Sequence, residues 1–351
     1  MLVAAACGEG APQAGAVPES ILEAAPAPLA ELWFDEARSG PYALDAALLV
    51  GDTLLLLEPG SGDIWSLSVR QRGGAATLIH EGRRAPQVLA QDLMSWDGKP
   101  GILDRQGGFW SLSEANLART PLVDLQRLRV LRVGDVAVDA GPGIVAIVTR
   151  VRMGALTTPP VPVIELVRIR SEDDVEVLAT LAEGSGATFE AFTLAQHGTD
   201  VHVFDILRSR RGLIPVDGSV RWIPLGSVVE RLLPVEELRE LEAALGQFSS
   251  RAQSVGISGN LPPTPRSRPA LIKVLFVDSG FFAVAEADRE SSSALDYYCL
   301  GNYQGTVLSG ANSIRFAEPY IVVVDRPDAT DGRTRLRVFN ALTIAPACEA
   351  P

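Results

Sequence analysis

From residue 31 onward, apolar runs of five to eight residues alternate with turns rich in Gly, Asp and Pro. Runs of this length, broken at intervals of about ten residues, predict β-strands joined by hairpins. One stretch, 234–248, instead spaces its apolar residues as a helix does. The pattern predicts an all-β protein that carries one helical insertion.

A repeat is visible within this pattern. Ile64–Ser68 returns as Phe109–Ser113, displaced by 45 residues. Four-stranded antiparallel units of about 45 residues, none of which can bury both faces alone, are the blades of a β-propeller. Such units fit the chain at 43–80, 88–125, 130–181, 189–225, 271–309 and 313–340. We therefore expect a six-bladed β-propeller.

The same kind of tight turn joins the first and second strands of five units. Gly and Asp suit such turns because they tolerate positive φ or bond to their own backbone. The turns are Gly51-Asp52, Asp97-Gly98, Asp139 to Gly141, His197-Gly198 and Asp278 to Gly280. Their common position supports the division into blades.

The sixth unit has only three predicted strands, which would leave an exposed sheet edge. Two segments are candidates to close the ring: Leu32–Phe34, before the first blade, and Leu342–Ala345, after the last. We expect Leu32–Phe34 to pair with the last blade. The propeller would then span 31–345, between a tether at 1–30 and a tail at 346–351.

A helical and Pro-rich insertion at 226–269 separates the fourth and fifth blades. Within it, Pro234–Phe248 places Leu238, Leu241, Leu245 and Phe248 on one helical face. The segment 261–269 contains four prolines and predicts an extended loop. We expect the apolar face to pack against the side of the propeller rather than against a partner.

Composition excludes several classes of protein. The apolar content of 47% is too high for a disordered chain, and the net charge of −12 disfavours nucleic acid as a partner. No uncharged apolar run reaches the roughly 18 residues of a membrane span. The three Cys and three His residues are too scattered for a zinc site of the usual spacing.

The N-terminal stretch suggests a lipid anchor. Small residues precede Cys7, and a Gly-, Ala- and Pro-rich spacer follows it. This order resembles the lipobox of bacterial lipoproteins, although Ala4 stands where that motif usually has Leu. We expect Cys7 to be the lipidated residue of a longer precursor; a frayed terminus with an incidental Cys is the alternative.

A family resemblance adds to this interpretation. The Pro-rich 261–269, followed by Val277–Gly280 and Phe282–Val284, resembles the bacterial six-bladed NHL-like β-propeller proteins, many of which are secreted or lipid-anchored. Glu58–Trp65 also resembles the strand end of the quinoprotein-type repeat, but only once. The inward carboxylates and Asn that hold a metal in the similar six-bladed lactonases have no match here, so we predict no catalytic, cofactor or metal residues.

Three groups of polar residues are candidate sites. His197 and His202, with Asp200 and Asp205, form the one His and carboxylate cluster and read as ordinary turn and strand residues. The acidic series Asp325, Asp328 and Asp331 lacks the alternate spacing of a calcium loop and predicts a solvated turn. The tip of the fourth blade carries three arginines, which predict either a solvated loop or a contact with an acidic partner or anionic lipid: Arg208, Arg210 and Arg211.

Cys299 and Cys348 remain once Cys7 is set aside. In an oxidising compartment they could form a disulfide that ties the tail to the fifth blade; alternatively, Cys299 is a buried thiol.

The sequence favours a non-enzymatic, lipid-anchored propeller on the periplasmic or outer face of a bacterial membrane. It would serve as a binding scaffold or accessory subunit of a membrane protein complex, without a cofactor. The alternative is a lactonase-like hydrolase or lyase acting on a sugar or lactone in the central channel.

Overall fold

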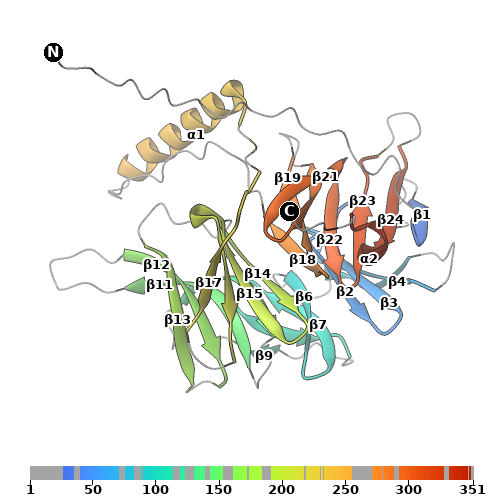
Figure 1. The fold of residues 1–351 in the computed structure, drawn as a ribbon, viewed down its shortest axis with the longest axis horizontal. Coiled ribbons are helices and arrows are strands. Elements are labelled where there is room, and N and C mark those ends of the chain that lie inside the picture. Colours follow the sequence, from blue (N-terminus) through green and yellow to red (C-terminus); the bar gives the residue numbers. More distant parts are fainter. Residues whose placement is uncertain are drawn as a thin grey trace, which may run out of the picture.

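A computed structural model describes the fold (Figure 1). The described residues are 27–34, 40–70, 76–82, 88, 90–113, 119–122, 130–138, 143–152, 161–171, 174–183, 191–216, 219–229, 231, 233–254, 271–278, 280–287, 292–327, 332–346 and 348. They form six antiparallel sheets of four strands each, which confirms the predicted six-bladed β-propeller.

The first three blades follow the chain from the inner to the outer strand. Blade 1 contains β2 (Ala46–Val50), β3 (Thr53–Leu57), β4 (Ile64–Ser68) and β5 (Thr77–His80). Blade 2 contains β6 (Ala90–Trp96), β7 (Lys99–Asp104), β8 (Gly108–Ser111) and β9 (Arg119–Pro121). Blade 3 contains β10 (Val130–Val138), β11 (Ile144–Arg152), β12 (Val161–Ile169) and β13 (Val175–Glu183).

Blades 4 and 5 follow the same order, and blade 6 borrows its outer strand from the start of the chain. Blade 4 contains β14 (Phe192–His197), β15 (Asp200–Asp205), β16 (Arg210–Ile214) and β17 (Arg221–Pro224). Blade 5 contains β18 (Lys273–Val277), β19 (Gly280–Glu286), β20 (Ser293–Cys299) and β21 (Asn302–Ala311). Blade 6 contains β22 (Ser313–Ala317), β23 (Tyr320–Val324), β24 (Thr334–Asn340) and β1 (Ala30–Phe34).

Strand β1 closes the ring as predicted. It pairs antiparallel with β24, in the register Leu32 to Leu336 and Phe34 to Thr334. Figure 1 shows the blue β1 beside the red β24. The competing segment forms the short helix α2 (Ala341–Ile344) instead, because the Asn340 side chain accepts a hydrogen bond from the Leu342 N–H at 2.9 Å and caps it.

The apolar residues are divided among six interfaces between neighbouring blades. For example, Leu54 and Leu56 of blade 1 pack with Val322 and Leu336 of blade 6. The other five clusters join the remaining neighbouring pairs in the same way. Each blade buries both faces only because another blade covers it, which is why the repeat is stable as a ring.

The insertion forms helix α1 (Val235–Ser254), which runs six residues beyond the predicted end because 249–254 contain no Pro or Gly. Figure 1 shows α1 standing to one side of the sheets. None of its described side chains is buried, and Leu238 and Leu241 join none of the six apolar clusters. Leu238 and Leu241 are half-buried, and the side chains of Leu245 and Phe248 lie outside the described part of the chain, so packing of this face on the propeller stays a prediction. The Pro-rich 261–269 lies outside the described residues.

No helix within the described part of the chain is long and apolar enough to cross a membrane.

Candidate functional site

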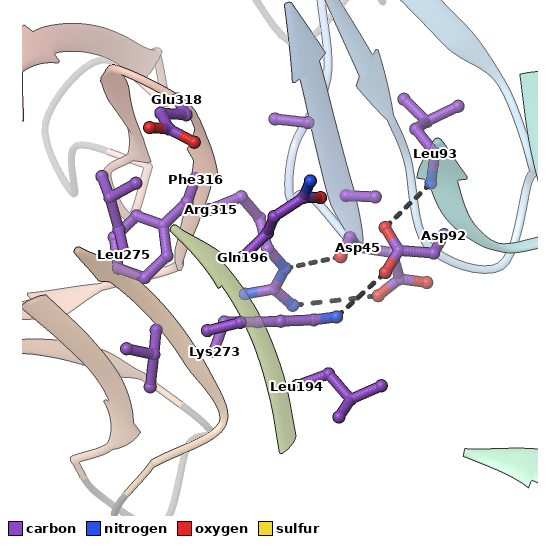
Figure 2. A pocket seen from close by; sticks show the side chains of 14 residues that line it. Asp45, Asp92, Leu93, Leu194, Gln196, Lys273, Leu275, Arg315, Phe316 and Glu318 are labelled. Atoms are coloured by element: carbon purple, nitrogen blue, oxygen red, sulfur yellow. Dashed lines mark hydrogen bonds and ion pairs between the residues drawn. The ribbon is translucent and has the colours of Figure 1, made fainter. Parts of the chain in front are cut away.

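The inner strands surround a central channel and contact one another there. One polar or charged residue from each blade meets in this channel, although apolar residues dominate the strands themselves. The six are Asp45, Asp92, Asp135, Thr193, Lys273 and Arg315. Figure 2 shows four of them, Asp45, Asp92, Lys273 and Arg315, pointing toward one another from different blades.

Lys273, the first residue of β18, is the centre of this cluster. Its Nζ lies 2.9 Å from Asp92 Oδ2 and 3.0 Å from Asp135 Oδ1. Burial alone would lower the pKa of Lys273, but the two carboxylates outweigh it and raise the pKa above its usual value. Lys273 is therefore a fixed cation, unsuited to act as a nucleophile or base at neutral pH.

Asp135 extends the cluster into blade 4. Its Oδ2 accepts hydrogen bonds from Thr193 Oγ1 at 3.0 Å and from the Leu194 N–H at 2.8 Å. Its Oδ1 accepts the Val136 N–H at 3.0 Å as well as the ammonium of Lys273. These bonds satisfy the carboxylate, so Asp135 holds three blades in position rather than presenting a free base.

Arg315 and Asp45 link blades 6 and 1. Arg315 Nε donates to the Asp45 carbonyl oxygen at 2.6 Å, and its Nη1 donates to the Ile314 carbonyl oxygen at 2.7 Å. The two side chains are more loosely paired, at 4.0 Å. Burial raises the pKa of Asp45, against the opposing effects of Arg315 and Arg105. The net effect is that the site favours the protonated form of Asp45 more than water does.

Two cavities meet at this pair. One, of about 200 Å³, lies in the channel and is lined by Asp45, Asp92, Gln196, Lys273, Arg315 and Glu318 among others. The second, of about 230 Å³, shares Asp45 and Arg315 and extends toward the ends of blades 5 and 6. The channel therefore has room for a small polar molecule. Most of the charged side chains beside this space already form hydrogen bonds or ion pairs with one another.

The described residues contain no set of three His, Cys, Asp or Glu side chains that could hold a metal ion. In the channel, the ammonium of Lys273 lies between two of the inward carboxylates, in the position that a cation would take. Among the described groups, the chemistry best suited to this channel is hydrogen bonding and ion pairing.

These channel residues were not predicted from the sequence. Asp92, Asp135, Lys273 and Arg315 each lie on a predicted first strand, where a single charge reads as a solvent-facing position. The available signal was a charged residue on the first strand of successive repeats. One of them, Lys273, is also one of only two lysines in the chain.

The two histidines of blade 4 lie at its interface with blade 5. The His202 ring lies 4.7 Å from that of Phe276, and the His197 ring lies 5.0 Å from it. His202 is buried and its Nδ1 has no hydrogen-bond partner. Burial, and then the nearby Arg211, lower the pKa of His202 to about 4. The structure brings the histidines to one aromatic surface, away from the channel cluster.

The arginines at the tip of blade 4 already have partners within the chain. Arg208 Nη1 and Arg210 Nε each lie 2.9 Å from Asp205 Oδ2, which is fully buried. Arg210 also stacks over the Trp222 ring at 3.8 Å. Arg211 lies over Phe276, on the face toward blade 5. Contact of these arginines with a partner or a lipid stays a prediction.

The remaining predicted residues are the cysteines and the acidic series. The structure joins Cys299 of β20 to Cys348 in a disulfide, with Cα atoms 5.4 Å apart, so the tail is tied to blade 5. Cys7 lies outside the described residues, as do Asp328 and Asp331. Asp325 accepts a hydrogen bond from Arg337 Nη2 at 2.5 Å.

No family model and no curated protein matches the chain. Solved structures similar to it include a luciferin-regenerating enzyme, at 11% identity and a TM-score of 0.49, covering 91% of this chain and 98% of that one. Virginiamycin B lyase from Staphylococcus aureus has 9% identity, a TM-score of 0.44 and coverages of 88% and 98%. A protein of Bacteroides fragilis thought to be exported has 10% identity, a TM-score of 0.49 and coverages of 88% and 94%. Likenesses this distant carry no argument about activity or location.

Proposed function

We propose that this chain is a non-enzymatic binding scaffold, or an accessory subunit of a membrane protein complex, that works outside the cytoplasm. The observation that carries the proposal is helix α1. It is a helix of 20 residues inserted between two blades, and none of its described side chains is buried. Its described apolar residues Leu238 and Leu241 are only partly covered by the rest of the chain, and an amphipathic helix with an accessible apolar face is a common way to engage a partner.

The segment just before α1 is fixed to blade 5, which supports the proposal that the propeller holds this helix in position for a partner. Arg231 lies just before the helix and binds Asp296 through both Nη atoms, at 2.8 and 2.7 Å. Asp296 is fully buried and also accepts the Thr306 hydroxyl at 2.8 Å. A two-point arginine contact to a buried carboxylate fixes direction as well as position.

The location outside the cytoplasm is supported by the disulfide between Cys299 and Cys348, since such bonds persist in oxidising compartments. The lipid on Cys7 rests on the sequence alone. Acylation there would hold the propeller at a membrane, through the Gly-, Ala- and Pro-rich spacer.

Site-specific crosslinking tests the scaffold function. A photoreactive amino acid at Leu238 should crosslink to one defined membrane or periplasmic protein in intact cells. The same group at Ile223, an exposed residue of the outer strand β17, is the matched control and should give no such product. Identical products from both positions, or none from Leu238, would contradict a role for α1.

The second candidate function is a lactonase-like hydrolase or lyase acting on a sugar or lactone in the channel. The observation that favours it is the cavity of about 200 Å³ beside Asp45, whose pKa is raised by burial. Turnover of such a substrate, lost in Asp45→Asn and dependent on a stoichiometric divalent metal, would favour the enzyme over the scaffold.

A further inference from the structure

In three blades, the carboxylate at the end of the second strand binds an arginine of its own blade. The guanidinium neutralises the carboxylate where two strands turn at the rim of the propeller. The pairs are Arg119 Nε to Asp104 Oδ2 at 2.9 Å, Arg210 Nε to Asp205 Oδ2 at 2.9 Å, and Arg337 Nη2 to Asp325 Oδ1 at 2.5 Å.

Among the described residues, blade 1 carries the carboxylate but shows no arginine bound to it. In its register Leu57 pairs with Ile64, as Leu103 pairs with Phe109 in blade 2. Glu58 therefore corresponds to Asp104. Within the described chain, Glu58 has no ion pair; its carboxylate accepts only the Ser61 hydroxyl at 3.2 Å and the Tyr42 N–H at 3.3 Å.

A cavity of about 90 Å³ lies at this position. Its lining includes two carboxylates, Glu58 and Asp63, and two aromatic rings, Tyr42 and Trp65. Water occupies about 30 Å³ per molecule in the liquid, so the space has room for a small group. Asp63 uses one oxygen, Oδ1, to accept the Gly82 N–H at 2.9 Å.

Trp65 provides a second, independent sign of a missing group. It is only 6% exposed, and its buried indole N–H has no hydrogen-bond partner. The corresponding indole in blade 2, that of Trp110, donates to Asp104 Oδ2 at 2.8 Å. The same oxygen also accepts a hydrogen bond from Arg119 Nε. In blade 2, one carboxylate therefore accepts from both the indole N–H and the guanidinium.

We propose that the cavity between Glu58, Asp63 and Trp65 binds a guanidinium group, supplied by free arginine or by an arginine side chain of another polypeptide. The ligand stacks on the aromatic lining and pairs with Glu58, as Arg119 pairs with Asp104. Bound in this way, Glu58 also accepts the Trp65 indole N–H. The inference stands apart from the scaffold function, because free arginine tests it without any partner.

The indole N–H signal of Trp65, followed by ¹⁵N NMR of the full chain and assigned with Trp65→Phe, reports binding directly. We expect a saturable shift on addition of L-arginine or N-acetylarginine methylamide, and none with N-acetyllysine methylamide. If only N-acetylarginine methylamide saturates the shift, the natural ligand is an arginine side chain of a polypeptide. If L-arginine saturates it as well, free arginine is also a ligand. Glu58→Gln should weaken binding at least about tenfold, since a charge-assisted bond is lost, whereas Glu242→Gln on α1 should not change it.

A gain-of-function variant tests the same inference without weakening the fold. Leu78 pairs with Trp65 in blade 1, at the register position that Arg119 holds opposite Trp110 in blade 2. Leu78→Arg should supply its own guanidinium, move the Trp65 signal without ligand and abolish arginine binding. The proposal is overturned if neither arginine compound shifts the signal or if Glu58→Gln binds as well as the native chain. It is also overturned if binding appears only after Arg38, Arg83 and Arg84, which lie outside the described residues, are changed to Ser.

Discussion

Lys273 of blade 5 and Asp135 of blade 3 meet in the central channel at 3.0 Å, although 138 residues of chain separate them. The same ammonium reaches Asp92 of blade 2 at 2.9 Å. This single ammonium places one positive charge between two carboxylates that would otherwise repel each other. Lys273 thus fastens three blades at the axis of the propeller.

Loss of this cation should destabilise the fold. Lys273→Met leaves Asp92 and Asp135 uncompensated, and we expect a loss of about 2–3 kcal/mol in the free energy of unfolding, because the charges are partly buried. Urea titration measures the loss. Lys99→Met is the matched control, since Lys99 is the only other lysine and is exposed. If the two variants unfold at the same urea concentration, Lys273 does not stabilise the fold.

The closing strand should contribute more than its length suggests. Deleting residues 1–36 removes β1, leaves β24 as an open edge and exposes the apolar residues that Leu32 and Phe34 cover. We expect a loss of at least about 3 kcal/mol, the usual cost of removing one buried aromatic side chain. Deletion of 1–26 alone, all outside the described residues, is the control and should melt at the native temperature. Equal melting of both truncated forms would show that another segment closes the ring.

The ring could be predicted from sequence, whereas the channel cluster could not. The 45-residue return of Ile64–Ser68 as Phe109–Ser113 marks local strand pairs, and repetition of local pairs is sufficient to define blades. Contacts between Lys273, Asp92 and Asp135 depend on closure of the whole ring, so no local pattern contains them. The docking of α1 on the propeller stays a prediction, because an apolar helical face indicates that something covers it without showing what.

Acid should destabilise the interface between blades 4 and 5. The pKa of His202 is about 4 in the folded protein, below its ordinary value, so the unfolded chain binds the proton first. Stability is full above about pH 6.5 and falls as the pH drops toward 4, by about 2 kcal/mol. His202→Phe should remove most of this dependence in urea midpoints measured at pH 7 and pH 4.5. His197→Gln, at an exposed position, should retain it; an unchanged slope in His202→Phe would assign the effect to other groups.

The disulfide should stabilise blade 5 and the tail. It closes a loop with a sequence separation of 49 residues, for which chain entropy predicts about 4 kcal/mol. Cys348→Ser should lower the melting temperature, and a reductant should lower that of the native chain but not that of the variant. Mass spectrometry after alkylation gives the oxidation state. Alkylation of Cys299 before any reduction would show that the bridge is absent.

The scaffold function is tested most directly by the mass of the protein extracted from its own membranes in mild detergent, measured by size-exclusion chromatography with light scattering. A scaffold should elute as one species heavier than the 37.3-kDa chain, with a single partner in constant ratio. Leu238→Glu with Leu241→Glu should dissociate it, and Glu242→Gln, on the polar side of α1, should not. Recovery of the monomer alone, or of an unchanged complex from the double variant, would rule out a scaffold that works through α1.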